Sequence, residues 1–137
     1  MRTALRLCAG AGLLALLFAA LTLAALELPE VVVIRTRAND GSLRETHIWI
    51  AEEEGVWMLE AASPESAWYR DLLREPRVEI LRGDRAVPVR LTAQPGPEGH
   101  RRIRALFRRK YGLADRWISF IQDGSRSVLV LAEPIAN

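Results

Sequence analysis

The chain has 137 residues, half of them hydrophobic, and 19 basic against 17 acidic side chains give it a formal net charge of +2 at pH 7. This length fits one ordinary domain, and the regular Val, Ile, Leu and Trp patterning excludes a disordered chain. The single cysteine, Cys8, excludes a disulfide scaffold. The charge surplus is too small for a generic nucleic-acid binder, so we expect no nucleic-acid partner.

An uncharged apolar segment extends from Leu7 to Leu26 and is preceded by Arg2 and Arg6. As a helix rising about 1.5 Å per residue it would be roughly 30 Å long, which matches the hydrocarbon thickness of a bilayer. The segment predicts a single-pass transmembrane helix over residues 1–28 and a membrane location, with a cleaved signal peptide as the alternative. Arginines flank it on both sides, so the side of the membrane that carries the globular part stays open.

Alternating, β-branched sequence follows Pro29 and predicts a globular domain over residues 29–137. The sequences Asn39-Asp40-Gly41 and Gly83-Asp84 are typical of hairpin turns, because glycine supplies the positive φ that a tight turn needs. We predict six strands, over residues 31–37, 43–50, 56–61, 78–80, 86–91 and 127–131.

Helical patterning lies in three places between these strands. Ser63 or Ser66 can cap a first helix that Pro76 ends, because the residue before proline avoids the α region. A second helix is predicted over residues 98–111, and a shorter third over 113–122. Six strands joined mainly by hairpins, with two to three flanking helices, indicate an α+β fold built on a small antiparallel β-barrel.

The usual catalytic motifs are missing from the sequence. His47 and His100 have no partner at metal-ligand spacing, so we expect no metal site. Neither a nucleophile elbow nor a phosphate-binding glycine loop occurs. An enzyme built on this chain would therefore draw its reactivity from a bound organic cofactor.

Two segments carry a family resemblance. The strand Val31–Arg37 with the turn Asp40–Thr46 resembles the opening hairpin of the flavin/deazaflavin split-barrel proteins. The stretch Trp68–Val78 is similar to the Trp-Tyr-x-Asn-Leu-x-x-x-Pro-x-Val element of the deazaflavin-dependent nitroreductase (nitroreductase/quinone reductase) family. The resemblance covers roughly residues 31–131. It implies a split barrel that transfers hydride from reduced deazaflavin (coenzyme F420), with FMN as the alternative, to a quinone or nitro-type acceptor.

The resemblance also implies roles for particular residues. Those expected at the cofactor are Ser42, Arg44, Ser63, Trp68 and Tyr69. Of these, Ser42 and Arg44 would approach the phosphate. Tyr69 and Tyr111 are the candidate catalytic residues, and Tyr111 with Trp117 would cover the acceptor. Each has a plainer interpretation: the aromatic side chains as core, and Arg44 as a solvated strand residue.

One segment departs from the family pattern. The loop Ala62–Ala67 lacks the glycines that cradle phosphate, Pro64 removes a backbone donor, and Glu65 would repel an anion. Whether the chain is an enzyme therefore stays open. The alternative is a non-catalytic split-barrel module that binds a lipophilic ligand or a protein partner at the membrane.

The partners expected from the sequence follow from these interpretations. They are membrane lipid, a lipophilic acceptor such as a quinone, and a second copy of the chain. Six cations within residues 101–110 fit a solvated helix face, attraction to anionic lipid or guidance of an anionic cofactor, and these alternatives stay open.

Overall fold

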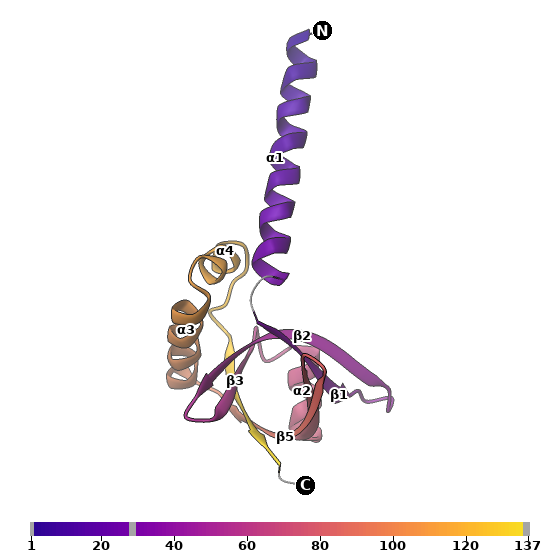
Figure 1. The fold of residues 1–137 in the computed structure, drawn as a ribbon, viewed down its shortest axis with the longest axis vertical. Helices are drawn as coiled ribbons and strands as arrows, with labels where there is room; N and C mark the ends of the chain where they lie inside the picture. Colours follow the sequence, from indigo (N-terminus) through magenta and orange to yellow (C-terminus); the bar gives the residue numbers. More distant parts are fainter. Residues whose placement is uncertain (1, 28–29, 136–137) are drawn as a thin grey trace.

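The computed structural model describes the backbone of residues 2–27 and 30–135, and the side chains of residues 10–25 and 30–135. The side chains of Arg2, Arg6 and Cys8 lie outside this part. The elements, in chain order, are α1 (Arg2–Glu27), β1 (Val31–Arg37), β2 (Leu43–Glu53), β3 (Val56–Ala61), α2 (Ala67–Arg74), β4 (Arg77–Arg82), β5 (Arg85–Gln94), α3 (Pro97–Tyr111), α4 (Leu113–Ile121) and β6 (Val128–Pro134). Figure 1 shows them along the chain.

The six antiparallel strands close into a barrel in the order β1-β2-β3-β6-β5-β4. Tight turns join β1 to β2, β2 to β3 and β4 to β5, and the helices α2, α3 and α4 occupy the two longer connections. At the first turn Gly41 has a φ of 84°, as the Asp-Gly sequence predicts, and the Ala38 N–H donates to the Ser42 carbonyl oxygen. The described part of the chain is thus α+β, with a closed six-stranded barrel and four helices.

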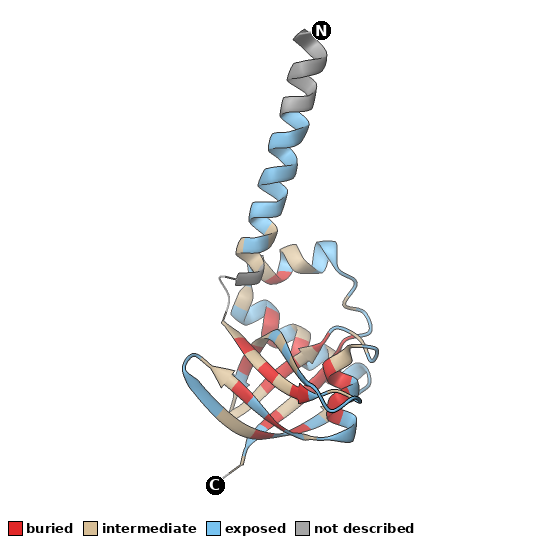
Figure 2. Cartoon of the chain, turned by 90° about the vertical axis from the view of Figure 1, so that its right-hand side faces the viewer, coloured by how far each residue is buried: buried red, intermediate tan, exposed pale blue. Residues whose placement is uncertain are grey.

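Alternation along the strands divides the apolar side chains between two clusters. The inner face of the barrel is filled by residues such as Ile34, Ile50, Leu59 and Val130, none of which is exposed. A second cluster lies on the outer face under α3, where Phe107 packs with residues of β2, β3 and β6. Figure 2 shows the buried residues in red along the strands and on parts of the helices. The barrel core positions β2 and β3, and the second cluster fixes α3 beside them.

The helix α2 packs against the inner cluster. Its Trp68, Tyr69 and Leu72 side chains belong to the barrel core, and its Asp71 is buried beside β1. The Asp71 carboxylate accepts a hydrogen bond of 2.8 Å from the Thr36 hydroxyl. This buried bond fixes the helix against the strand.

The N-terminal helix α1 extends away from the barrel, and its contacts with the rest of the chain are mainly with α4 (Figure 1). The rings of Phe18 and Trp117 lie 5.2 Å apart, and the Trp117 Nε1–H donates to the Thr22 hydroxyl at 3.0 Å. The side chains of Leu13 and Leu16 on this helix are 69 % and 70 % exposed.

The prediction of a transmembrane helix over residues 1–28 is wrong. Among the residues that the structure describes, no helix is long and apolar enough to cross a membrane. The membrane location predicted from this helix is wrong with it.

Candidate functional site

The strands β2 and β3 separate at one end. They pair only from Ile50 with Leu59 to Glu53 with Val56. Beyond Leu59, β3 continues to Ala61 along β6, whereas the earlier part of β2, from Leu43, continues along β1. We call this divergence the fork. Backbone groups at its edges are not used in a β2–β3 ladder, although the six strands still close the barrel.

A pocket of about 350 Å³ lies in the fork and is covered by α3 and α4. We call it the fork pocket, and its lining is Val31, His47, Ile48, Trp49, Glu60, Ala62, Arg104, Phe107, Ile118 and Gln122. Its volume falls within the range of roughly 300–1,000 Å³ that is usual for small-molecule sites. The walls combine aromatic and aliphatic side chains with a few charged ones, which is the composition expected of such a site.

A largely buried charge cluster borders this pocket, and two of its members, Glu60 and Arg104, belong to the lining. The Arg104 guanidinium donates to Glu60 Oε2 at 2.9 Å, to Asp115 Oδ1 at 2.5 Å and to the Ser119 hydroxyl at 2.9 Å. Burial would lower the pKa of Arg104, but the charges of Glu60 and Asp115 outweigh it and raise that pKa. Arg104 is therefore a permanent cation that joins β3, α3 and α4.

The aromatic side of the site ends at Tyr111. Its ring lies 4.6 Å from that of Trp49, which in turn lies 5.9 Å from Phe107. The Tyr111 hydroxyl accepts from the Ile50 N–H at 3.1 Å, and its proton faces the carbonyl oxygens of Ile50 (2.5 Å) and Glu30 (3.0 Å). Burial raises the pKa of Tyr111 to about 12, so the hydroxyl stays protonated at neutral pH. It bridges the strand backbone at the start of the barrel.

A second pocket, of about 300 Å³, lies between the β1–β2 turn and α2. We call it the arginine pocket, and its lining is Ala38, Asn39, Asp40, Arg44, Ala67, Arg70, Asp71 and Arg74. Three guanidinium groups against two carboxylates make it net positive, which suits an anion. Arg44 stands on β2 three residues before His47, so the arginine pocket and the fork pocket are both lined by residues of β2 but share none.

Asp71 organises the arginine pocket. Its carboxylate accepts from Arg44 Nε at 2.8 Å and from Arg74 Nη2 at 2.6 Å. Burial would raise the pKa of Asp71, but the hydrogen bonds from Arg44 and Thr36 outweigh it and lower that pKa. Arg70 makes no ion pair with any residue from 30 to 135, so its charge is available to a ligand.

The two predicted serines are engaged in their own turns. The Ser42 hydroxyl and N–H both donate to Asp40 Oδ1, at 2.6 and 2.9 Å. The Ser63 hydroxyl accepts from the Glu65 N–H at 3.3 Å, and the Ser63 N–H donates to the Ser66 hydroxyl at 3.2 Å. Neither serine lines the fork pocket or the arginine pocket.

The predicted aromatic residues fall in different places. Trp68 and Tyr69 are 5 % and 6 % exposed in the barrel core and line neither pocket. Tyr111 lies on the other side of the barrel wall, at the end of α3. The two candidate catalytic tyrosines are therefore not brought together, and of the residues predicted at the cofactor only Arg44 lines one of these pockets.

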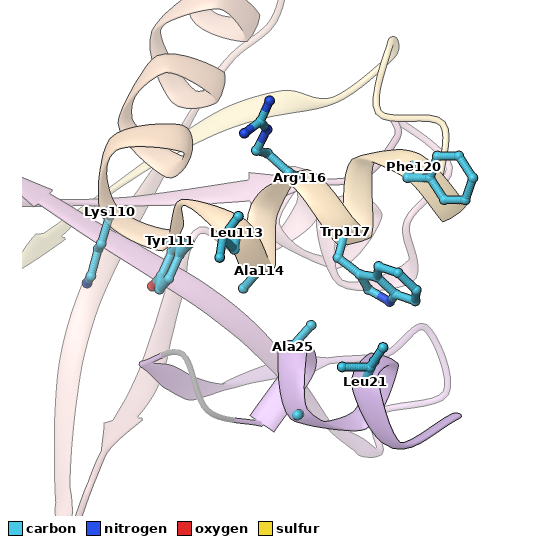
Figure 3. Close-up of a pocket in the computed structure, with 10 residues that line it drawn as sticks. Leu21, Ala25, Lys110, Tyr111, Leu113, Ala114, Arg116, Trp117 and Phe120 are labelled. Atoms are coloured by element: carbon cyan, nitrogen blue, oxygen red, sulfur yellow. The ribbon is translucent and has the colours of Figure 1, made fainter. Parts of the chain in front are cut away.

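A third hollow lies between α1 and α4, with a volume of about 810 Å³. We call it the groove (Figure 3), and its lining is Leu21, Ala24, Ala25, Lys110, Tyr111, Leu113, Ala114, Arg116, Trp117 and Phe120. In Figure 3 Ala114 and Trp117 point toward α1, Leu21 and Ala25 point toward α4, and Arg116 points away. Tyr111 and Trp117, which the resemblance placed at the acceptor, thus share one apolar hollow.

Several residues of these sites are absent from the sequence-based predictions. Arg70 and Arg74 are spaced i, i+4 on α2, so that an exposed cationic stripe opposite Trp68 could have pointed to them. Glu60, Arg104 and Asp115 are far apart in the sequence, and no local pattern relates them.

Solved structures of other proteins share the fold. An F420-H2 dependent reductase, FDR-A, is 20% identical, with 74% of this chain and 93% of that one covered and a TM-score of 0.55. The heme storage protein HutZ from Vibrio cholerae is 12% identical over 82% and 87% of the two chains, with a TM-score of 0.60. A domain-swapped dimer is 20% identical over 74% and 79%, with a TM-score of 0.56.

At these identities the likeness confirms the resemblance to deazaflavin split-barrel proteins as one of fold. No curated protein matches the sequence. The family model "Uncharacterized protein conserved in bacteria (DUF2255)" matches residues 22–130. Since that range is most of the chain, the protein belongs to the DUF2255 family.

Proposed function

We propose that this protein is a split-barrel oxidoreductase that passes a hydride from reduced deazaflavin (coenzyme F420), or alternatively from reduced FMN, to a quinone or nitro-type acceptor. The observation that carries the proposal is the pair of pockets lined by residues of β2, one of them aromatic and in the fork and the other net positive. A planar ring and a phosphate-bearing tail are the two parts of such a cofactor. The shared fold of an F420-H2 dependent reductase supports the same assignment.

The residues present fit this kind of group. The fork pocket offers the rings of Trp49 and Phe107 to a planar ligand, and Arg44 and Arg70 offer charge to a phosphate. Glu65, the acidic residue of the altered loop, is paired with Arg126 at 2.5 Å, which offsets its repulsion of an anion. The cofactor, when bound, supplies the hydride. The chain would bind it, orient it and exclude water beneath α3 and α4.

The residues predicted from the sequence differ in how directly they would contact the cofactor. Arg44 is a phosphate ligand, while Ser42 and Ser63 would reach the cofactor only by giving up their turn bonds. Trp68 and Tyr69 would support the site by holding α2 in the barrel. Tyr111 would keep a protonated hydroxyl beside the acceptor.

The test is oxidation of reduced deazaflavin by menadione or a nitrofuran, followed by absorbance. We expect turnover by the purified chain, and Arg70→Ala raises the KM for the cofactor about tenfold with kcat unchanged, because a lost charged contact to phosphate weakens binding alone. Arg85→Ala, at the β4–β5 turn, is the matched control and keeps both constants. Absence of turnover with both reduced deazaflavin and reduced FMN refutes the proposal.

A second candidate function is a non-catalytic module that binds a lipophilic ligand. The groove favours it, because Leu113 and Phe120 on α4 are 79 % and 81 % exposed beside an apolar hollow. The neutral dye N-phenyl-1-naphthylamine should fluoresce on binding, and Phe120→Ser should weaken that signal. Leu43→Ser, an exposed leucine outside the groove, should leave it unchanged.

We also propose a homodimer. A solved neighbour that is described as a domain-swapped dimer supports it. Sedimentation should give about twice the chain mass of 15.4 kDa. A mass of one chain at every concentration would contradict the pairing.

A further inference from the structure

The exposed large hydrophobic side chains of this protein are concentrated on two helices. Of the twelve such side chains in the described part of the chain, ten lie on α1 or α4, and the other two are Leu43 and Leu73. Each carries on the order of 100 Å² of apolar surface, so the ten carry on the order of 1,000 Å². A molecule that covered most of them would bury the roughly 800 Å² per partner of a standard protein–protein interface.

One side of α1 is in contact with α4, and another side is exposed. Phe18 and Thr22 face α4, where both contact Trp117. Successive residues of a helix are rotated by about 100°, so Leu13 and Leu17 project from a different side, and they are 69 % and 54 % exposed. That side repeats at intervals of four, three and four residues, the heptad spacing of paired helices. We call it the seam, and its members are Leu13, Leu17, Ala20 and Ala24.

The seam has large side chains at one end and small ones at the other. Leu13 and Leu17 lie in the half of α1 that extends away from the barrel, whereas Ala20 and Ala24 lie nearer to it (Figure 1). Ala24 also lines the groove of about 810 Å³ between α1 and α4. A second copy of α1 in antiparallel orientation would bring a leucine against each alanine. Large side chains packed into the space beside small ones make a close helix contact.

The charge and the shape of α1 favour a second copy as the occupant of this surface. Residues 10–25 carry no charge, so two such helices meet without like-charge repulsion. Because α1 extends away from the barrel, the antiparallel pair keeps the two barrels at opposite ends (Figure 1). A two-fold axis then forms both halves of the contact at once. A small ligand in the groove would leave Leu13 and Leu17 exposed, whereas a second helix covers both.

We infer that two copies of this chain pair through α1 in antiparallel orientation. In this pair, Leu13 of each copy packs against Ala24 of the other, and Leu17 packs against Ala20. The inference rests on the proposed homodimer and deepens it by naming the interface. It makes α1 an oligomerisation helix whose leucines complete the groove side of a second molecule.

A charge placed in the middle of the seam tests the interface. We expect sedimentation of the full chain to show a dimer, and Leu17→Glu to raise its dissociation constant at least about a hundredfold, because pairing would bury two unpaired carboxylates. Leu17 is exposed in the single chain, so the variant should keep the circular dichroism of the wild type. Leu73→Glu, which makes the same change at an exposed leucine of α2, is the matched control and should remain a dimer.

Cross-linking tests the direction of the helices. The only native cysteine is replaced first, as Cys8→Ser. A mixture of chains carrying Leu13→Cys and chains carrying Ala24→Cys should then form a disulfide-linked dimer on oxidation. Leu13→Cys alone should not, because its two copies lie at opposite ends of the antiparallel seam. A disulfide that forms in Leu13→Cys alone and not in the mixture overturns the antiparallel pairing.

The remaining outcomes separate this inference from the proposals on which it rests. A wild-type dimer that Leu17→Glu leaves intact refutes the α1 interface and leaves the homodimer standing. A wild type that stays a single chain at every concentration refutes both. A single chain that also binds N-phenyl-1-naphthylamine would assign the groove to a small lipophilic ligand instead of a second copy.

Discussion

At the scale of single residues, Asp71 does the most to join separate parts of the chain. Its carboxylate accepts from Thr36 on β1, Arg44 on β2 and Arg74 on its own helix. One side chain thereby fixes the opening hairpin to α2 and sets the position of Arg44 in the arginine pocket. The position of Arg44 in the arginine pocket therefore depends on Asp71, a residue whose own role is to hold the fold together.

Asp71→Asn should lower the free energy of unfolding by about 2–3 kcal/mol, because it leaves Arg44 and Arg74 without their carboxylate partner in a buried position. The folded pKa of Asp71 lies below its ordinary value of 3.8, so its contribution is present above about pH 4 and is lost as the pH falls through the folded pKa. Urea unfolding at several pH values measures both effects. Asp84→Asn, in the exposed β4–β5 turn, is the control. Equal acid sensitivity of Asp71→Asn and wild type would contradict this account.

For Tyr111 we predict a loss of stability at alkaline pH, whereas for Asp71 the loss is expected at acid pH. Its pKa is raised from 10.0 to about 12, so the stability it contributes is full below pH 10 and is lost as the pH rises toward 12. Tyr111→Phe removes the partner of the Ile50 N–H and should cost about 1 kcal/mol at neutral pH. The variant should also lack the alkaline loss, as judged by denaturation at pH 8 and pH 11. A variant that loses as much stability as wild type between these pH values would show that Tyr111 is not the group responsible.

At the scale of elements, the close approach of α3 to the end of β5 depends on Gly99. A Cβ at this position would overlap the carbonyl oxygen of Gln94 and touch Leu129. Gly99 is buried in the first turns of the helix. The small residue lets α3 lie flat against the barrel, where it covers the fork pocket.

Gly99→Ala should therefore destabilise the fold by about 1–3 kcal/mol, because the helix must move off the backbone that it touches. Gly124→Ala is the matched control, since a Cβ there would meet nothing within 4 Å. Thermal unfolding of both variants measures the difference. Equal melting temperatures would mean that α3 can shift without loss.

The sequence pattern predicted most of the helices and strands but not how they are arranged in space. Two-residue alternation and the turn glycines predicted six strands, and β1 and β3 have the predicted bounds. β2 extends to Glu53, three residues past the prediction, because its end pairs with β3. The fork and the Glu60–Arg104–Asp115 cluster depend on contacts between distant segments, which no local period reveals. The transmembrane prediction is wrong, since no helix in the described part of the chain is long and apolar enough to cross a membrane.

At the scale of the whole molecule, the last strand is an interior member of the barrel. β6 pairs with β3 along residues 57–61 and with β5 along residues 89–94, so both halves of the sheet meet on it. Its Leu129 and Val130 are completely buried, one in each cluster. The barrel cannot close without this segment.

A chain that ends before Val128 should therefore lack a cooperative unfolding transition. Without β6, β3 and β5 would both lose a pairing strand, and the core would lose the buried side chains of that strand. Circular dichroism during heating detects the transition in the full chain and its loss in the truncated one. A truncated chain that still melts cooperatively would refute the dependence on β6.

This dependence has a consequence for the order of events during synthesis. β6 follows the other five described strands in the chain, so for a time the nascent protein carries five strands whose closing partner has not yet been synthesised. During that interval β3 and β5 present unpaired edges and the apolar interior stays open, which favours aggregation. The barrel can therefore close only after β6 has left the ribosome.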